Sequence, residues 1–201
     1  MKKRIYITIA LLAASIGLVN AQPGSHFNIS YNIAFPSGDL GDFITKTSWR
    51  GATLEWKGVI NEKVTAGIEG SWQTFYEDLD FDTYDIELSN ITLAGKQYRT
   101  VNNIPIYARV DYHGGVEGDN VRWFAGVGVG TMWSERINDM GLYRFIDDPW
   151  HFALAPRIGV QYFLNDWRAL TISAVYDYGF KTSQNTAMDY FRISVGLSFI
   201  N

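Results

Sequence analysis

Apolar and polar residues alternate along most of this chain, and this period of two constrains the fold more than any other feature. Alternation places the two kinds of side chain on opposite faces of an extended strand. It recurs over residues 27–35, 49–60, 64–75, 104–112, 125–131, 152–162, 170–180 and 191–199. After residue 21 the chain has no stretch with a convincing helical period. The sequence therefore predicts an all-β fold of eight strands.

The segments between these strands alternate between short and long. The shorter connections are 61–63, 113–121 and 164–168, and the longer ones are 36–48, 76–103, 134–150 and 181–189. Up-and-down barrels of bacterial outer membranes have this asymmetry, with short periplasmic turns and long extracellular loops. We therefore expect an antiparallel up-and-down barrel with its termini and short turns in the periplasm and its long loops outside.

Soluble barrels such as lipocalins have the same period, but their apolar face points inward. The chemical character of the two faces therefore distinguishes a soluble barrel from a membrane barrel. Here the larger apolar residues share one face, and the other face is mostly Ser, Thr, Gly, Asn and Ala. Aromatic residues gather near strand ends, as in the two interfacial girdles of membrane barrels. The girdle residues are Trp49, Trp56, Trp72, Tyr112, Trp123, Trp133, Trp150, Tyr162, Trp167, Tyr190 and Phe191. The sequence thus predicts an eight-stranded antiparallel up-and-down transmembrane β-barrel.

The longest connection, 76–103, keeps part of the alternation. Ile86, Leu88, Ile91 and Leu93 stand among polar neighbours. We therefore expect the third and fourth strands to extend above the membrane as a hairpin, or a short extra hairpin to form. Acidic residues outnumber basic ones in this segment by six to two, a balance that suits a cationic partner or divalent ions.

The first 21 residues are predicted to be a secretory signal peptide that is removed before Gln22. They combine a basic start at residues 2–4, an apolar stretch at 5–19 and small residues at the cleavage site. The alternative is a membrane-anchoring helix, but the apolar stretch is short of the roughly 20 residues that a span needs. Residues 22–201 then form a single outer-membrane barrel domain.

Four segments carry a resemblance to a known family, namely 99–106, 123–131, 156–160 and 191–199. Through them, residues 22–201 resemble the small eight-stranded bacterial outer-membrane barrels of the OmpA, OmpX and OmpW kind. The resemblance implies an outer-membrane location, contact with membrane lipids and lipopolysaccharide, and insertion by the barrel assembly machinery. The family's aromatic last residue is displaced here, because Ile200 and Asn201 follow Phe199. The resemblance implies no single activity, since function resides in sites rather than in folds.

Eight charged residues fall on the face that should point into the barrel, and acids and bases are equal in number. They are Glu55, Lys57, Glu69, Arg109, Asp111, Arg157, Asp177 and Arg192. Side chains fill the interior of an eight-stranded barrel, and a buried charge is expensive unless it is paired. We therefore expect a network of salt bridges that plugs the lumen, with Lys57 beside Glu55, Asp111 beside Arg109, and the remaining acids on Arg157 or Arg192. A gated, narrow ion path is the alternative.

Composition and the remaining motifs exclude several functions. The chain has no Cys, which excludes disulfides, thiolate metal sites and a lipoprotein anchor. Its net charge of -4 offers no basic surface for nucleic acid. The glycines at positions 126, 128 and 130 do not match a nucleotide-binding loop and are interpreted as making room inside the barrel. His26, His113 and His151 are not expected to converge, so no metal site and no cofactor are predicted.

We predict a non-enzymatic outer-membrane protein with a structural or surface-interaction role, its extracellular loops meeting an external ligand. Porin-like or OmpW-like passage of small or hydrophobic solutes is the alternative. Lipid A modification is a weaker one: His151, Ser134 and Glu135 fall near the outer leaflet, but parity places Ser134 and Glu135 on opposite faces.

Overall fold

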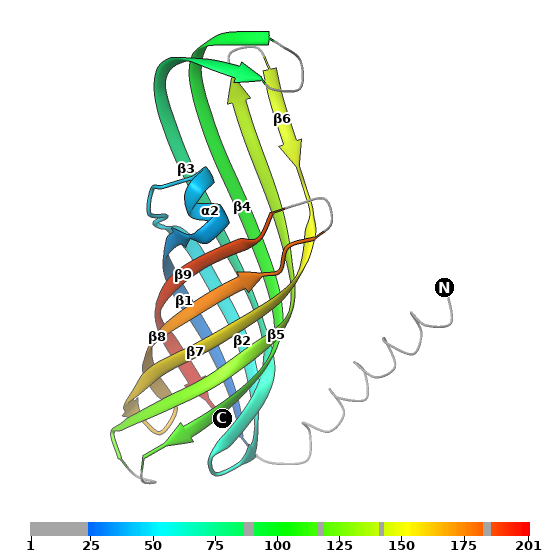
Figure 1. Cartoon of the computed structure of the whole chain (residues 1–201). Coiled ribbons are helices and arrows are strands. Elements are labelled where there is room, and N and C mark those ends of the chain that lie inside the picture. Colours follow the sequence, from blue (N-terminus) through cyan, green and yellow to red (C-terminus); the bar gives the residue numbers. More distant parts are fainter. Residues whose placement is uncertain (1–23, 87–90, 116–118, 141–142, 183–185) are drawn as a thin grey trace, which may run out of the picture.

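The structure is a computed structural model that describes residues 24–86, 91–115, 119–140, 143–182 and 186–201 (Figure 1). The predicted signal peptide lies outside these residues. The strands are β1 (Ser25–Ser37), β2 (Arg50–Asn61), β3 (Val64–Ile86), β4 (Ile91–Gly114), β5 (Val121–Met140), β6 (Tyr143–Asp147), β7 (Trp150–Asn165), β8 (Arg168–Gly179) and β9 (Met188–Ile200). A short helix, α2 (Gly38–Phe43), follows β1.

All the strands except β6 close into a barrel in which every neighbouring pair is antiparallel. The seam joins the first strand to the last, with register from His26↔Ile200 to Ser37↔Asp189. The expected fold class, an eight-stranded antiparallel up-and-down barrel, is confirmed. Connections at one end are short, such as 62–63 and 166–167. We term this the short-turn end, and the opposite end the long-loop end.

Strands β3 and β4 continue far past the barrel at the long-loop end. They contain 23 and 24 residues, against 13 in β1, and remain paired up to Ile86↔Ile91. The hairpin expected within 76–103 is therefore confirmed. β6 was not predicted; it pairs with the upper part of β5, above β7. Residues 76–86, 91–100, 134–140 and 143–147 form a wall beyond the barrel (Figure 1), termed the projecting sheet below.

The outer face of the barrel is apolar. Ile29, Leu54, Ile68 and Ile158, for example, are all exposed there, whereas their polar neighbours in sequence point inward and are buried. This is the arrangement of a barrel that meets lipid on the outside and keeps a polar interior. Within the described ranges, no helix is long and apolar enough to span a bilayer.

Helix α2 corrects the expectation that the chain forms no helix. Six residues make less than two turns, too few for a helical period to show in the sequence. The helix folds over the long-loop end (Figure 1). Leu40 within it and Ile44 directly after it are completely buried. Gly38 begins it with a φ of 46°, in the left-handed region. A Cβ at Gly38 would lie 2.2 Å from Oδ2 of Asp189, so glycine is needed here on both counts.

Candidate functional site

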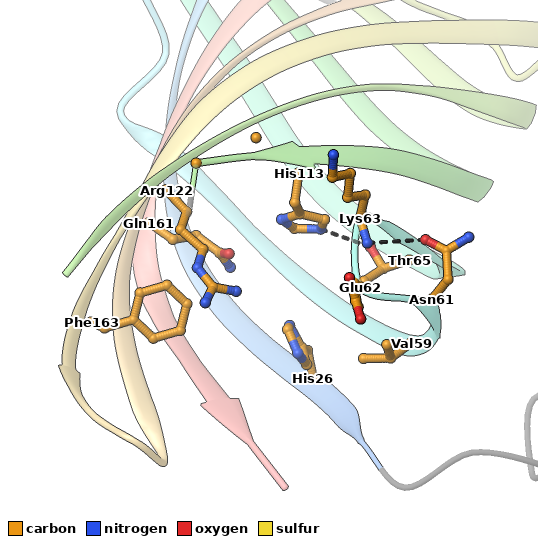
Figure 2. Close-up of a pocket in the computed structure, with 12 residues that line it drawn as sticks. His26, Val59, Asn61, Glu62, Lys63, Thr65, His113, Arg122, Gln161 and Phe163 are labelled. Atoms are coloured by element: carbon orange, nitrogen blue, oxygen red, sulfur yellow. Dashed lines mark hydrogen bonds between the residues drawn. The ribbon is translucent and has the colours of Figure 1, made fainter. Parts of the chain in front are cut away.

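A cavity of about 840 Å³ lies inside the short-turn end of the barrel (Figure 2). His26 on β1 and His113 on β4 both line it, and their ring centroids are 6.4 Å apart. Nε2 of His113 lies 3.0 Å from Oγ1 of Thr65. The histidines thus partly converge, whereas His151 is the second residue of β7, at the long-loop end. Sequence reasoning missed the cavity because its lining comes from six strands and a turn.

Phe124 separates this cavity from the charged part of the lumen. Its ring centroid is 5.8 Å from that of His113. On the charged side, the Lys57 ammonium and the Arg157 guanidinium lie 5.4 Å and 5.2 Å from the ring centroid. A Cβ at Gly159 would lie 2.4 Å from Cζ of Phe124, so the glycine makes room for this ring. Phe124 therefore lies between His113, which lines the cavity, and the charged side chains of the lumen.

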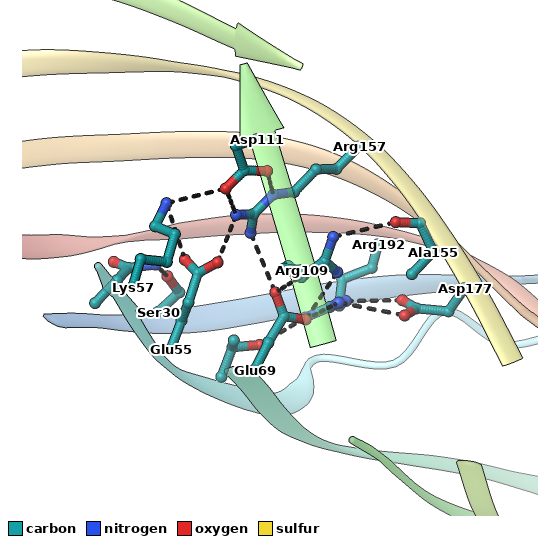
Figure 3. A network of polar contacts seen from close by, with 12 residues as sticks. Ser30, Glu55, Lys57, Glu69, Arg109, Asp111, Ala155, Arg157, Asp177 and Arg192 are labelled. Atoms are coloured by element: carbon teal, nitrogen blue, oxygen red, sulfur yellow. Dashed lines mark hydrogen bonds and ion pairs between the residues drawn. The ribbon is translucent and has the colours of Figure 1, made fainter. Parts of the chain in front are cut away.

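Above Phe124, the carboxylate of Glu69 is the centre of a network of ion pairs (Figure 3). It accepts hydrogen bonds from Nη2 of Arg109 at 3.0 Å, Nη1 of Arg157 at 3.1 Å and Nη2 of Arg192 at 2.8 Å. The three arginines project from β4, β7 and β9. Nε of Arg192 also donates to Asp177 at 2.8 Å. One carboxylate on β3 therefore ties together strands from around the barrel.

The other half of the network surrounds the guanidinium of Arg157. Its Nε donates to Oδ1 of Asp111 at 2.8 Å, and its Nη2 contacts both Asp111 and Glu55. The ammonium of Lys57 lies 3.3 Å from Asp111 and 3.4 Å from Glu55. The expected pairing of Lys57 with Glu55 is thus present, and across the lumen Lys57 also contacts Asp111 on β4 while Glu55 contacts Arg157 on β7.

The expected pairing of Asp111 with Arg109 is corrected. Arg109 turns to Glu69 and to the carbonyl oxygen of Ala155, which accepts a hydrogen bond of 3.1 Å. Asp111 is held by Arg157 and Lys57 instead. Residues two apart on a strand share a face, but long side chains in a narrow lumen reach other strands, which sequence spacing does not reveal.

All eight charged residues expected in the lumen are buried there, and Arg157, with 8% exposed, is the most accessible. Four acids and four bases make the group neutral. Each of the four acids lies within 4 Å of at least one base. Neutrality and multiple contacts are what allow such a group to remain buried. The arrangement fills the middle of the barrel.

Glycines on β5 give the network its space. A Cβ at Gly126 would lie 2.1 Å from Oδ1 of Asp111, and one at Gly130 would lie 2.0 Å from the carbonyl oxygen of Ile106. A Cβ at Gly128 would lie 3.1 Å from the Tyr107 side chain. These glycines thus make room inside the barrel, in line with their sequence interpretation.

Between the network and α2 the lumen becomes apolar. Phe75, Tyr107 and Tyr190 are buried there, and the rings of Phe75 and Tyr190 are 5.5 Å apart, edge to face. The expected place of Tyr190 in the outer girdle is therefore wrong. Its neighbour Phe191 is exposed on the outside, and successive strand residues face opposite ways, so the two cannot share a girdle.

The other girdle residues lie on the outer face. Trp133 and Trp150 are register partners near the long-loop end. Tyr112 and Trp123 lie near the short-turn end with ring centroids 6.0 Å apart. The members that are exposed or half-buried are Trp49, Trp56, Trp72, Tyr112, Trp123, Trp133, Trp150, Tyr162, Trp167 and Phe191.

Contacts with the projecting sheet hold α2 and the residues after it in place. The backbone N–H of Thr45 donates to Glu77 at 2.8 Å. Nη1 of Arg99 donates to the carbonyl oxygen of Phe43 at 2.6 Å, and its guanidinium lies 5.0 Å from the Phe43 ring centroid. On the other side, the N–H of Ala187 donates to Asp39 at 2.9 Å. Residues 38–48 therefore form a fixed cap over the lumen.

The outer part of the projecting sheet exposes large apolar side chains. Every residue of β6 is exposed, including Tyr143, Phe145 and Ile146. Asp139 on β5 accepts two hydrogen bonds from Arg144 on β6, of 2.5 Å and 2.9 Å. These bonds lower the pKa of the Asp139 carboxyl. The sheet is thus held by cross-strand pairs while its apolar side chains remain accessible.

The residues considered for lipid A modification, His151, Ser134 and Glu135, do not form a common site. Oγ of Ser134 donates to Asn103 at 2.7 Å, while Nδ1 of His151 lies 3.0 Å from the carbonyl oxygen of Phe180. Glu135 accepts a hydrogen bond from Asn102. In the part of the chain that the structure describes, there is also no group of three or more His, Asp or Glu residues that could hold a metal ion.

Together, a closed barrel of eight strands, an apolar outer face and exposed aromatic side chains near both ends are features of the small outer-membrane barrels. No protein-family model and no curated protein matches this chain. The fold is similar to that of Ail, the attachment invasion locus protein of Yersinia pestis. The two are 13% identical with a TM-score of 0.55, over 90% of this chain and 99% of that chain. Ail has also been solved with the heparin analogue sucrose octasulfate.

Two further solved barrels have a similar fold. The outer membrane protein OprG from Pseudomonas aeruginosa is 12% identical with a TM-score of 0.55, over 89% of this chain and 96% of that chain. Neisserial surface protein A is 13% identical with a TM-score of 0.50, over 88% of this chain and 94% of that chain. At these identities the similarity establishes the fold alone.

Proposed function

We propose that this chain is a non-enzymatic outer-membrane protein that presents the projecting sheet to partners outside the cell. One observation carries the proposal: side chains fill the middle of the lumen, while β3, β4 and β5 continue past the barrel and β6 pairs with β5 there. From Trp72 in the aromatic belt to Ile86, β3 runs for about 45 Å at about 3.3 Å per residue. Such a length is unnecessary for crossing a bilayer, which takes about 9–11 residues of strand.

The filled lumen argues against the alternative of solute passage. A solute would have to displace Phe124, the neutral ion-pair network, the apolar layer around Phe75 and Tyr190, and the cap. Each of these is held by contacts to several strands. Planar-bilayer recordings of the purified protein test this point, with small or no stable conductance expected. Large, steady conductance would show that the lumen is a pore.

The character of the projecting sheet indicates the kind of partner. Exposed residues such as Phe81, Tyr143 and Phe145 offer apolar contacts of the kind that mark interaction surfaces. The acidic excess in 76–103 favours a basic protein or peptide, since opposite charges speed and orient association. A sulfated polyanion such as the one bound by Ail would be repelled.

A trimmed hairpin tests this role. Leu79 and Gln97 are register partners, so residues 80–96 can be replaced by an Asn-Gly turn, which retains the contacts of Glu77 and Arg99 with the cap. In nanodiscs, the full chain should bind an oligolysine peptide and not heparin, and the trimmed chain should lose peptide binding. Binding that persists after trimming, or preference for heparin, would contradict the proposal.

The proposed location carries further expectations. Residues 1–21 direct export and are then cleaved. The barrel assembly machinery inserts the remaining chain, and lipopolysaccharide surrounds it in the outer leaflet. The long-loop end faces outward. Epitope tags at residue 90 should be labelled on intact cells, and tags at residue 118 should not. The reverse pattern would contradict this orientation.

A further inference from the structure

We propose that the cavity at the short-turn end binds a small organic anion, with the acidic head held by Arg122 and Gln161 and the apolar body against Phe163 and Val59. This site lies at the opposite end of the barrel from the projecting sheet and goes beyond the proposed surface role. A solute would enter it from the compartment that the short turns face.

The first argument is a set of hydrogen-bonding atoms that have no partner. Gln161 is 1% exposed, yet its Nε2 makes no hydrogen bond with any described residue. The same holds for Nε of Arg122 and Nδ1 of His26. These residues project from β7, β5 and β1 and line one cavity. A buried donor left unpaired costs about 1–3 kcal/mol, so the donors on Arg122 and Gln161 around one space indicate a site made to receive acceptor atoms.

The second argument is the orientation of Arg122. Its guanidinium carbon lies 5.2 Å from the ring centroid of Phe163, and Figure 2 shows it directed into the cavity between Phe163 and His26. Packing on a ring fixes the plane of the guanidinium. A fixed guanidinium offers two parallel donors to a carboxylate or phosphate. Phe163 also provides an apolar wall beside that head group.

The third argument is size and closure. The volume of about 840 Å³ falls within the range of about 300–1,000 Å³ that is usual for small-molecule sites. Behind His113, Phe124 and the buried ion pairs occupy the inner side, so a ligand would bind and leave by the same mouth. At that mouth the turn contributes Lys63 beside Glu62. The interior of the site is therefore rich in hydrogen-bond donors, and the positive charge of Arg122 favours a negatively charged ligand.

Phenyl phosphate is a suitable probe because it joins a phosphate to a ring, and benzyl alcohol is its uncharged counterpart. Titration calorimetry would use the full chain in nanodiscs of zwitterionic lipid. We expect saturable binding of phenyl phosphate and none of benzyl alcohol. Arg122→Gln should weaken binding about tenfold or more, as expected for loss of a charge-assisted pair. Gln161→Leu should weaken it as well.

Arg168→Gln is the matched control. Arg168 lies at the same end of the barrel but is exposed and outside the cavity, so its replacement should leave affinity unchanged. Far-UV circular dichroism and the electrophoretic shift on heating report whether each variant is folded. If Arg122→Gln does not fold, Gln161→Leu decides. No saturable binding, equal binding of benzyl alcohol, or equal loss in Arg168→Gln would overturn the proposal. None of these outcomes bears on the surface role.

Discussion

Oε1 of Glu69 on β3 accepts a hydrogen bond of 2.8 Å from Nη2 of Arg192 on β9, although β1 and β2 lie between these strands. Because Glu69 also faces Arg109 and Arg157, Glu69→Gln should leave three buried guanidinium groups with one carboxylate fewer. We expect a loss of about 3–5 kcal/mol in the free energy of unfolding. Urea unfolding in lipid vesicles measures it.

An exposed ion pair provides the control for that experiment. Asp139→Asn breaks the pair with Arg144 on the projecting sheet, where solvent screens both groups. Its unfolding curve should match that of the unchanged protein. If Glu69→Gln is equally harmless, the network does not hold the barrel together.

Gly126→Ala should destabilise the barrel by about 1–3 kcal/mol, because the added methyl group would meet Asp111 and the backbone of Val110. Gly70→Ala is the matched change on the outer face, where a Cβ meets nothing within 4 Å. It should be neutral or slightly stabilising. Equal unfolding midpoints for the two variants would show that the glycines in β5 are not needed for packing.

Gly38→Ala should loosen the cap, since its φ of 46° is strained for alanine and the methyl group would meet Asp189. We expect the free energy of unfolding to fall by about 1–3 kcal/mol. Gly41→Ala, in the same helix, has its nearest contact at 3.7 Å and should be tolerated. Fluorescence from a probe attached to residue 46 would report cap mobility, which should rise in Gly38→Ala alone.

Ile158→Arg should lower the free energy of unfolding by about 2–4 kcal/mol, because Ile158 lies in mid-strand on the surface that we expect to face lipid. Ile146→Arg should cost far less, because the projecting sheet stands in water. The two isoleucines are 61% and 54% exposed, so exposure alone does not separate them. Vesicle unfolding experiments compare them directly, and similar losses would mean that Ile158 does not face lipid.

Alternation predicted the barrel because a strand with two unlike faces leaves a period of two in the sequence. The same parity placed Glu69, Arg157 and Arg192 in the lumen. It also excludes Tyr190 from the girdle that holds Phe191, so that error arose from grouping aromatics by position along the strand without regard to face.

Other features could not be predicted because they depend on contacts between distant residues. The pairing of Asp111 with Arg157 rather than Arg109 depends on how long side chains cross the lumen. The position of α2 depends on Glu77 and Arg99, which lie on β3 and β4, far from the helix in the sequence. β6 is too short to show a period, and the cavity around Gln161 exists only once six strands have come together.

The seam between β1 and β9 has a consequence for how the molecule is made. Its register joins His26 to Ile200, so closure must wait for the last strand. Until then the sheet has two open edges and an apolar face with no lipid around it, which favours aggregation. Contacts this distant also form slowly. The unclosed chain is therefore the form in which both sheet edges and the apolar face are open to contact with other chains.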